Sequence, residues 1–170
     1  NDLRTSIESS SPQFLKLGLA GTLPSGKNWR TEWQRIRAST PGHHSWVAVA
    51  YADHASAAAP AVIDVLHAAI ETHAAVLLID THIKDGTSLC DHLTFNELEN
   101  LRRETRQHGM QLALAGRISI FDLPRLMPLQ PDIVAVRGAV CEHSDRTGTV
   151  SEKRIHEFRD ALRIIRSGRS

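Results

Sequence analysis

The stretch Val76-Leu77-Leu78-Ile79-Asp80-Thr81-His82-Ile83-Lys84-Asp85-Gly86 passes from four apolar residues directly into a polar segment. Its apolar part does not alternate with polar residues, which is typical of a strand buried on both faces, as in a parallel sheet covered by helices. The charged residues and the glycine that follow indicate a loop. This segment therefore predicts an α/β fold with Asp80 and Lys84 at the carboxyl end of a central strand.

Four further apolar runs of the same kind predict strands at residues 14–19, 46–51, 112–115 and 133–136. Amphipathic patterns predict helices between and after them, at residues 31–37, 59–72, 94–108, 121–127 and 151–165. Thr94 and Glu97 have the spacing of a capping box, and Ser119 and Ser151 are candidate N-caps. This alternation fits either an open doubly wound sheet or a (β/α)₈ barrel, and periodicity does not choose between them.

The composition favours one domain, residues 1–170, that binds a small ligand. The chain has 170 residues, 41% of them hydrophobic, which is enough for a buried core. Its 20 basic and 19 acidic residues nearly cancel, so no overall field favours nucleic acid or a membrane surface. No apolar run approaches the roughly 20 residues that cross a bilayer. Two distant cysteines, Cys90 and Cys141, favour a reducing, cytoplasmic setting.

Asp80 and Lys84 are the first candidates for catalysis, because ligands of parallel α/β folds bind at the carboxyl ends of the strands. A neighbouring carboxylate and amine can share proton transfers. An amine can also serve carbonyl chemistry as an acid, a base or a Schiff-base nucleophile. The alternative is a surface ion pair at the start of a loop. An aspartate at the end of a central strand is a costly choice for solubility alone, which favours the functional interpretation.

Two further charged residues lie in or after predicted strands. Lys16 interrupts the apolar run at residues 14–19. Its amine lies either inside a barrel near the catalytic mouth, where it would attract phosphate or react with a carbonyl, or on an edge strand that faces water. Asp53 follows the second strand and either binds substrate or caps a helix.

Glycines and arginines follow the fourth and fifth strands, at Gly116-Arg117 and Arg137-Gly138. Loops after the last two strands of a barrel often hold phosphate, because glycine permits close approach and helix N-termini supply positive potential. Gly116, Arg137 and Gly138 are therefore candidate phosphate ligands. The ten histidines match no standard spacing of metal ligands, so we expect no metal. Cys141 is more typical of a buried small residue than of a nucleophile.

The chain resembles the (5-formylfuran-3-yl)methyl phosphate synthase family, also named 4-(hydroxymethyl)-2-furancarboxaldehyde-phosphate synthase. The resemblance runs in order from about Phe14 to the last helix, and the Asp-Thr-x-x-Lys-Asp-Gly stretch is its most distinctive part. The segments that carry it are Lys16-Leu17-Gly18-Leu19, Ala48-Val49-Ala50-Tyr51-Ala52-Asp53, Leu78-Ile79-Asp80-Thr81-His82-Ile83-Lys84-Asp85-Gly86, Leu112-Ala113-Leu114-Ala115-Gly116 and Val136-Arg137-Gly138-Ala139-Val140-Cys141.

This resemblance implies an aldolase-like (β/α)₈ barrel that condenses two molecules of glyceraldehyde 3-phosphate into a phosphorylated furan aldehyde. Phosphate and water are lost, no metal or organic cofactor takes part, and the product feeds methanofuran-type cofactor biosynthesis. Lys16, Asp80 and Lys84 match family positions for substrate handling and proton transfer. Gly116, Arg137 and Gly138 would lie at the phosphate end.

One part of the family pattern has no counterpart here. The family's proposed Schiff-base lysine belongs to an Asp-x-Lys motif on an early strand, and no matching segment precedes Lys16. A full barrel typically has about 250 residues. We therefore expect an incomplete barrel with about five carboxyl-terminal strand-helix units. The alternative function is a non-catalytic α/β module that binds a phosphate ester, and the sequence leaves a homo-oligomer open.

Overall fold

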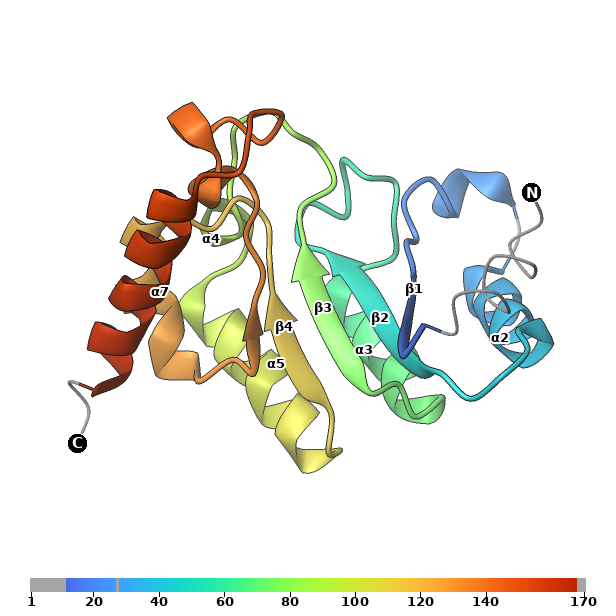
Figure 1. Cartoon of the computed structure of the whole chain (residues 1–170). Coiled ribbons are helices and arrows are strands. Elements are labelled where there is room, and N and C mark those ends of the chain that lie inside the picture. The colour runs from blue at the N-terminus through green and yellow to red at the C-terminus, as the bar shows by residue number, and fades with distance from the viewer. Residues whose placement is uncertain (1–11, 27, 168–170) are drawn as a thin grey trace.

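Five strands form one parallel sheet in the computed structural model, which describes residues 12–26 and 28–167 (Figure 1). Each strand pairs in parallel with the next one along the chain, so the predicted α/β class is confirmed. The first and last strands end two residues earlier than predicted, at Leu17 and Val134, where their pairing with the second and fourth strands stops. The strands are β1 (Phe14–Leu17), β2 (Ser45–Tyr51), β3 (Val76–Asp80), β4 (Gln111–Leu114) and β5 (Ile133–Val134).

The sheet winds in one direction, with the order β1-β2-β3-β4-β5. A doubly wound sheet reverses its strand order at a switch point, where its ligand binds. No such reversal occurs in the described part of the chain, and sequential order is the arrangement of strands in a (β/α)₈ barrel. Within residues 12–26 and 28–167, β1 and β5 each pair on one side only, so this part of the sheet is open.

The helices follow the predicted positions with some differences. The capping box of Thr94 and Glu97 is present. The helix expected at residues 121–127 is divided into short turns, because Pro124 and Pro128 lack the amide hydrogen that a continuous helix requires. Helix α4 and the turns η4 and η5 were not expected from the sequence. The α-helices are α2 (Trp29–Ser39), α3 (Val62–Glu71), α4 (Leu89–His92), α5 (Phe95–Gln107), α6 (Leu123–Leu126) and α7 (Glu152–Ser167). The 3-10 turns are η1 (Leu23–Ser25), η2 (Ile120–Asp122), η3 (Met127–Leu129), η4 (Gly138–Val140) and η5 (Glu142–Ser144).

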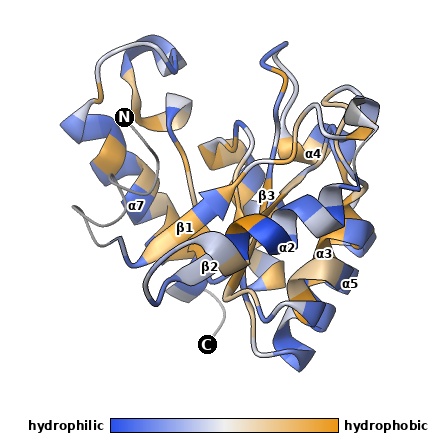
Figure 2. Cartoon of the chain, turned by 90° about the vertical axis from the view of Figure 1, so that its right-hand side faces the viewer, coloured by the Kyte–Doolittle hydropathy of each residue, from blue (hydrophilic) through white to orange (hydrophobic). Residues whose placement is uncertain are grey.

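One face of the sheet packs against helices. Ala48, Leu77 and Leu112 lie side by side in register and are fully buried in the main core. Figures 1 and 2 show α3 and α5 on the same side of the sheet, and buried residues of both helices belong to that core. The amphipathic pattern of these helices therefore accounts for the burial of one sheet face.

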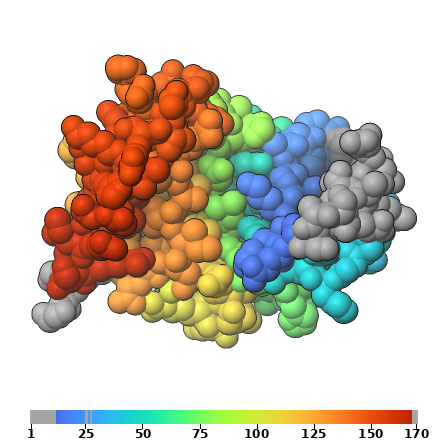
Figure 3. All heavy atoms as spheres, viewed as in Figure 1, coloured from blue at the N-terminus to red at the C-terminus, as the bar shows by residue number. Residues whose placement is uncertain are grey.

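The other face, which we call the open face, carries the side chains that alternate with the core residues. Lys16, Val47, Val76 and Gln111 are register partners on it, followed two residues later by Gly18, Val49, Leu78 and Ala113. Lys16 is exposed, as are Phe14 and Ile133, with exposed fractions of 46% and 40%. Figure 3 shows segments from the first to the last strand at the surface on this side. Lys16 thus belongs to an edge strand and also faces away from the helix-covered core.

No helix in the described ranges has both the length and the apolar character that crossing a membrane requires.

Candidate active site

The carboxyl ends of the three central strands are held together by backbone hydrogen bonds. Tyr51 of β2 is the register partner of Asp80 of β3. The Ala52 amide donates to the Asp80 carbonyl at 2.8 Å, and the Ala115 amide donates to the Ile79 carbonyl at 2.8 Å. Because register partners share a face, Tyr51 and Asp80 both lie on the open face. The polar loop after β3 therefore begins at an ordered edge of the sheet.

Asp80 ends β3 and Lys84 lies in the loop that follows, but the two side chains do not pair with each other in the described part of the chain. Asp80 is half-buried, and its Oδ1 accepts a hydrogen bond from the Thr81 amide at 2.8 Å. Lys84 Nζ donates to the Thr81 carbonyl and lies 3.4 Å from Thr81 Oγ1. The alternative interpretation, a surface ion pair between these two residues, is thus not found in the described residues, and the carboxylate and the amine can each meet a ligand separately.

Asp53 holds this loop from the end of the neighbouring strand. The residue is 5% exposed, and its carboxylate accepts hydrogen bonds from the amides of His82 (2.8 and 3.1 Å) and Ile83 (2.7 Å). Burial raises the pKa of this carboxyl, but the hydrogen bonds from the two amides outweigh burial, so the pKa lies below its usual range. Asp53 therefore fixes the backbone of the loop, and a direct contact with substrate stays a prediction.

Gly116 lets the end of β4 approach the same loop closely. Its φ is +95°, and a β-carbon at this position would lie 3.0 Å from Thr81 Cγ2 and 3.1 Å from the Thr81 amide nitrogen. Its carbonyl accepts a hydrogen bond from the Leu89 amide at 2.8 Å, which connects β4 to the start of α4. Phosphate binding by Gly116 stays a prediction, and its close approach to Thr81 is a structural reason for glycine at this position.

We expect Gly116→Ala to destabilise the protein by roughly 2 to 3 kcal/mol, from a strained φ and displacement of Thr81. Gly109→Ala is the matched control, because Gly109 also has a positive φ of +65° but no atom within 4 Å of the added carbon. The control should cost only about 1 kcal/mol. Urea unfolding of both variants measures the difference. Equal losses would contradict a close contact between Gly116 and the loop.

Arg137 and Gly138 lie in a separate loop region. Arg137 is exposed, and its Nε donates to the Arg146 carbonyl at 2.7 Å. A β-carbon on Gly138 would lie 3.2 Å from the Ser144 carbonyl oxygen. No hydrogen bond or ion pair within residues 12–26 and 28–167 joins these two residues to Asp53, Asp80 or Lys84. Their predicted contact with phosphate stays a prediction.

The structure adds Tyr51 and His82 to this region, and it places Arg117, which the sequence interpretation noted only beside Gly116, at the loop after β3. The rings of Tyr51 and His82 meet edge to face, with centroids 5.1 Å apart. The Arg117 guanidinium lies over Gly86, with its Nη1 2.8 Å from the position of an added β-carbon. The sequence could have pointed to Tyr51, because it ends β2 two residues before Asp53, and residues two apart along a strand lie on the same face. His82 and Arg117 are placed by loop conformation, which leaves no periodic pattern.

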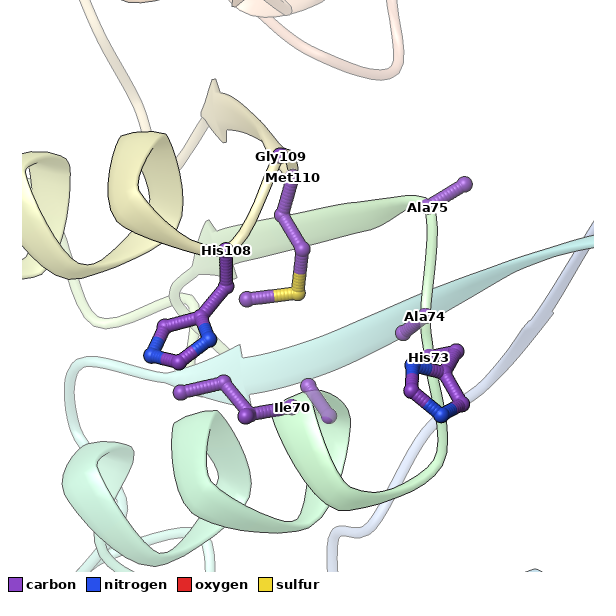
Figure 4. Close-up of a pocket in the computed structure, with 8 residues that line it drawn as sticks. Ile70, His73, Ala74, Ala75, His108, Gly109 and Met110 are labelled. Carbon is purple, nitrogen blue, oxygen red and sulfur yellow. The ribbon is translucent and has the colours of Figure 1, made fainter.

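Two pockets in the described part of the chain lie away from Asp80. One, with a volume of about 310 Å³, lies at the amino ends of β3 and β4, where His73, His108 and Met110 line it (Figure 4). The other, of about 260 Å³, lies between β1 and α2 and is lined by Leu17, Trp29 and other residues. In the described part of the chain, no three of the side chains that commonly bind metal ions come together.

Comparison with known proteins gives consistent matches. A family model described as 4-HFC-P synthase matches residues 4–159. The (5-formylfuran-3-yl)methyl phosphate synthase of Archaeoglobus fulgidus is 31% identical over 151 residues, which are 88% of this chain and 64% of that protein. The enzyme of the same name from Methanococcus aeolicus is 33% identical over 155 residues, 89% of this chain and 66% of that protein. The chain thus spans slightly under two thirds of the length of these relatives.

Proposed function

The chain belongs to the 4-HFC-P synthase family, and from that membership we propose that its protein is a carbon-carbon bond-forming lyase. In this proposal two molecules of glyceraldehyde 3-phosphate condense to 4-(hydroxymethyl)-2-furancarboxaldehyde phosphate, with loss of phosphate and water. The reaction would serve methanofuran-type cofactor biosynthesis. The observation that carries the proposal is the family match across residues 4–159, which includes every candidate site residue.

The open face supports this chemistry through its charged groups. Lys16 is exposed on it, and register aligns Lys16 with Val47 and then with Val76. Asp80 lies four residues further along β3, an offset of about 13 Å at 3.3 Å per residue. This offset leaves room for a phosphorylated triose between the two side chains. We assign substrate handling to Lys16 and proton transfer to Asp80 and Lys84, with any Schiff base formed on a lysine.

The positive groups at the same edge suit the substrate's phosphates. Arg117 and Lys84 both lie at the loop after β3, and Arg137 follows β5. Guanidinium groups bind phosphate in two-point contacts. Gly116, Arg137 and Gly138 therefore remain the proposed phosphate ligands, with Asp53 as a residue that positions the loop.

The sheet is proposed to be part of a (β/α)₈ barrel. Support comes from the one-directional strand order, from a sheet face on which Phe14, Lys16 and Ile133 are exposed and from the greater length of the relatives. In a closed barrel the open face would line the interior, and its carboxyl end would form the active site.

The test is turnover by the product of the complete reading frame. Incubation with glyceraldehyde 3-phosphate should release one phosphate for every two trioses consumed, because the proposed product keeps one phosphate. The conjugated furan aldehyde should appear in the ultraviolet spectrum in step with phosphate release. A folded protein that binds the triose phosphate without releasing phosphate would instead be a non-catalytic phosphate-ester-binding module. No binding and no release would overturn both functions.

A further inference from the structure

Tyr51 occupies the space that a side chain at position 18 would need. A β-carbon on Gly18 would lie 2.6 Å from the Tyr51 hydroxyl oxygen and 3.7 Å from Cζ. The phenol ring therefore extends from the end of β2 across to β1, over the backbone two residues after Lys16. Positions 18 and 51 both belong to the open face. The Tyr51 hydroxyl therefore lies toward β1, the strand that carries Lys16.

The same phenol ring also lies next to the carboxyl end of β3 and the loop that follows it. Tyr51 is the register partner of Asp80, and its ring contacts His82 edge to face. Burial raises the pKa of the Tyr51 phenol, and the negative charges of Asp80 and Asp53 raise it further. The hydroxyl is consequently held in its protonated form, which can donate a hydrogen bond, throughout the neutral pH range.

We propose that the Tyr51 hydroxyl is a catalytic hydrogen-bond donor to the triose oxygen between Lys16 and Asp80, an inference that rests on the proposed function. Carbon-carbon bond formation at an aldehyde places negative charge on the carbonyl oxygen. A fixed donor aimed at that oxygen stabilises the transition state more than the bound substrate. Gly18 is part of this arrangement because a β-carbon there would lie 2.6 Å from the hydroxyl oxygen, so that the phenol would have to move.

Tyr51→Phe removes the donor and keeps the ring. We expect kcat to fall about 10²-fold with little change in KM, as for the loss of one donor to a developing oxyanion. Ile63→Val is the control: it shortens an exposed side chain of α3, on the helix-covered side of the sheet, and its kcat should stay within about twofold. A kcat for Tyr51→Phe within twofold of the wild type would overturn the inference.

A double-mutant cycle with Gly18→Ala tests the position of the hydroxyl. Alone, Gly18→Ala should displace the phenol and lower kcat about tenfold or more. When combined with Tyr51→Phe it should cost almost nothing further, because Cζ already lies 3.7 Å from the added carbon. Additive losses would show that the hydroxyl is not what Gly18 accommodates and would overturn the inference.

A titration separates this inference from the proposed function. Tyr51 is the only tyrosine of the 170-residue chain, so labelling tyrosine Cζ with ¹³C gives one NMR signal. Its pKa should exceed 10.0, and Asp80→Asn should lower it, whereas the distant Asp145→Asn should not. The same pKa in the wild type and in Asp80→Asn would overturn the placement of the phenol. If the wild type releases no phosphate, the proposed function fails while this titration still decides the position of Tyr51.

Discussion

Lys84→Ala is expected to lower the rate of phosphate release from glyceraldehyde 3-phosphate about 10³-fold, within the range for loss of a group that transfers protons. The variant should remain folded. Lys84 is exposed, and among the described residues its amine hydrogen-bonds only Thr81, so the lost hydrogen bond should cost less than about 1 kcal/mol. The rate is measured by phosphate release at saturating triose, and folding by the melting temperature, which should change by no more than about 2 to 4 °C.

Lys153→Ala is the matched control for this prediction. Lys153 lies on α7 with a side chain that is 85% exposed, and it pairs weakly with Glu157 one turn later at 3.9 Å. Its removal takes away the same charge without changing the site, so turnover should be unaffected. Asp80→Asn should reduce turnover as Lys84→Ala does. Wild-type turnover in both site variants would remove Asp80 and Lys84 from the active site.

Asp53→Asn is expected to destabilise the protein by about 2 to 4 kcal/mol at pH 7 and to lower turnover as well. The buried carboxylate accepts hydrogen bonds from two loop amides, and an asparagine side chain has only one oxygen to replace two. Its amino group would instead face an amide hydrogen, and a buried donor without a partner costs about 1 to 3 kcal/mol. The loss is large beside a total stability of roughly 5 to 15 kcal/mol. Urea unfolding and the rate of phosphate release measure both effects.

The stability loss should depend on pH in a defined direction. The pKa of Asp53 is lower in the folded chain than its ordinary value of 3.8, so its contribution is fully present above that value and is lost as the pH falls through the folded pKa. The difference in free energy of unfolding between wild type and Asp53→Asn should therefore be constant near neutral pH and become smaller below about pH 4. Asp160→Asn serves as control, because Asp160 lies on α7 far from this loop, with a side chain that is 56% exposed. A gap that stays constant down to pH 2 would contradict this role for Asp53.

The strands were predictable because each is encoded by a local pattern. Apolar runs mark strands without knowledge of their partners. The burial on both faces that these runs predicted is not found in the edge strands β1 and β5 of the described sheet, where Phe14, Lys16 and Ile133 are exposed. The positions of Asp80 and Lys84 followed from the rule that ligands bind at the carboxyl ends of such strands. The direction in which the sheet winds was not predictable, since periodicity is the same for both parallel architectures.

Contacts between distant residues account for what the sequence did not reveal. The carboxylate of Asp53 bonds amides about thirty residues later, so the sequence offered only substrate binding or helix capping for it. The fit between the Tyr51 hydroxyl and Gly18 likewise joins two strands across the sheet. Two prolines divided the helix expected at residues 121–127, an effect that the amphipathic pattern concealed. Long-range pairing and loop conformation leave no periodic trace in the chain.

Side chains alternate between the two sheet faces along β1, so inserting or deleting one residue there would disturb the structure more than a substitution would. Leu15 and Leu17 are half-buried while Lys16 between them is exposed. Inserting or deleting a single residue ahead of Lys16 while pairing with β2 is kept would exchange the two faces. The amine would enter the helix-covered core and a leucine would take its place on the open face. Point substitutions at neighbouring positions would leave this arrangement intact, so in the history of such a protein a shift of one residue here would be far more damaging than a change of side chain.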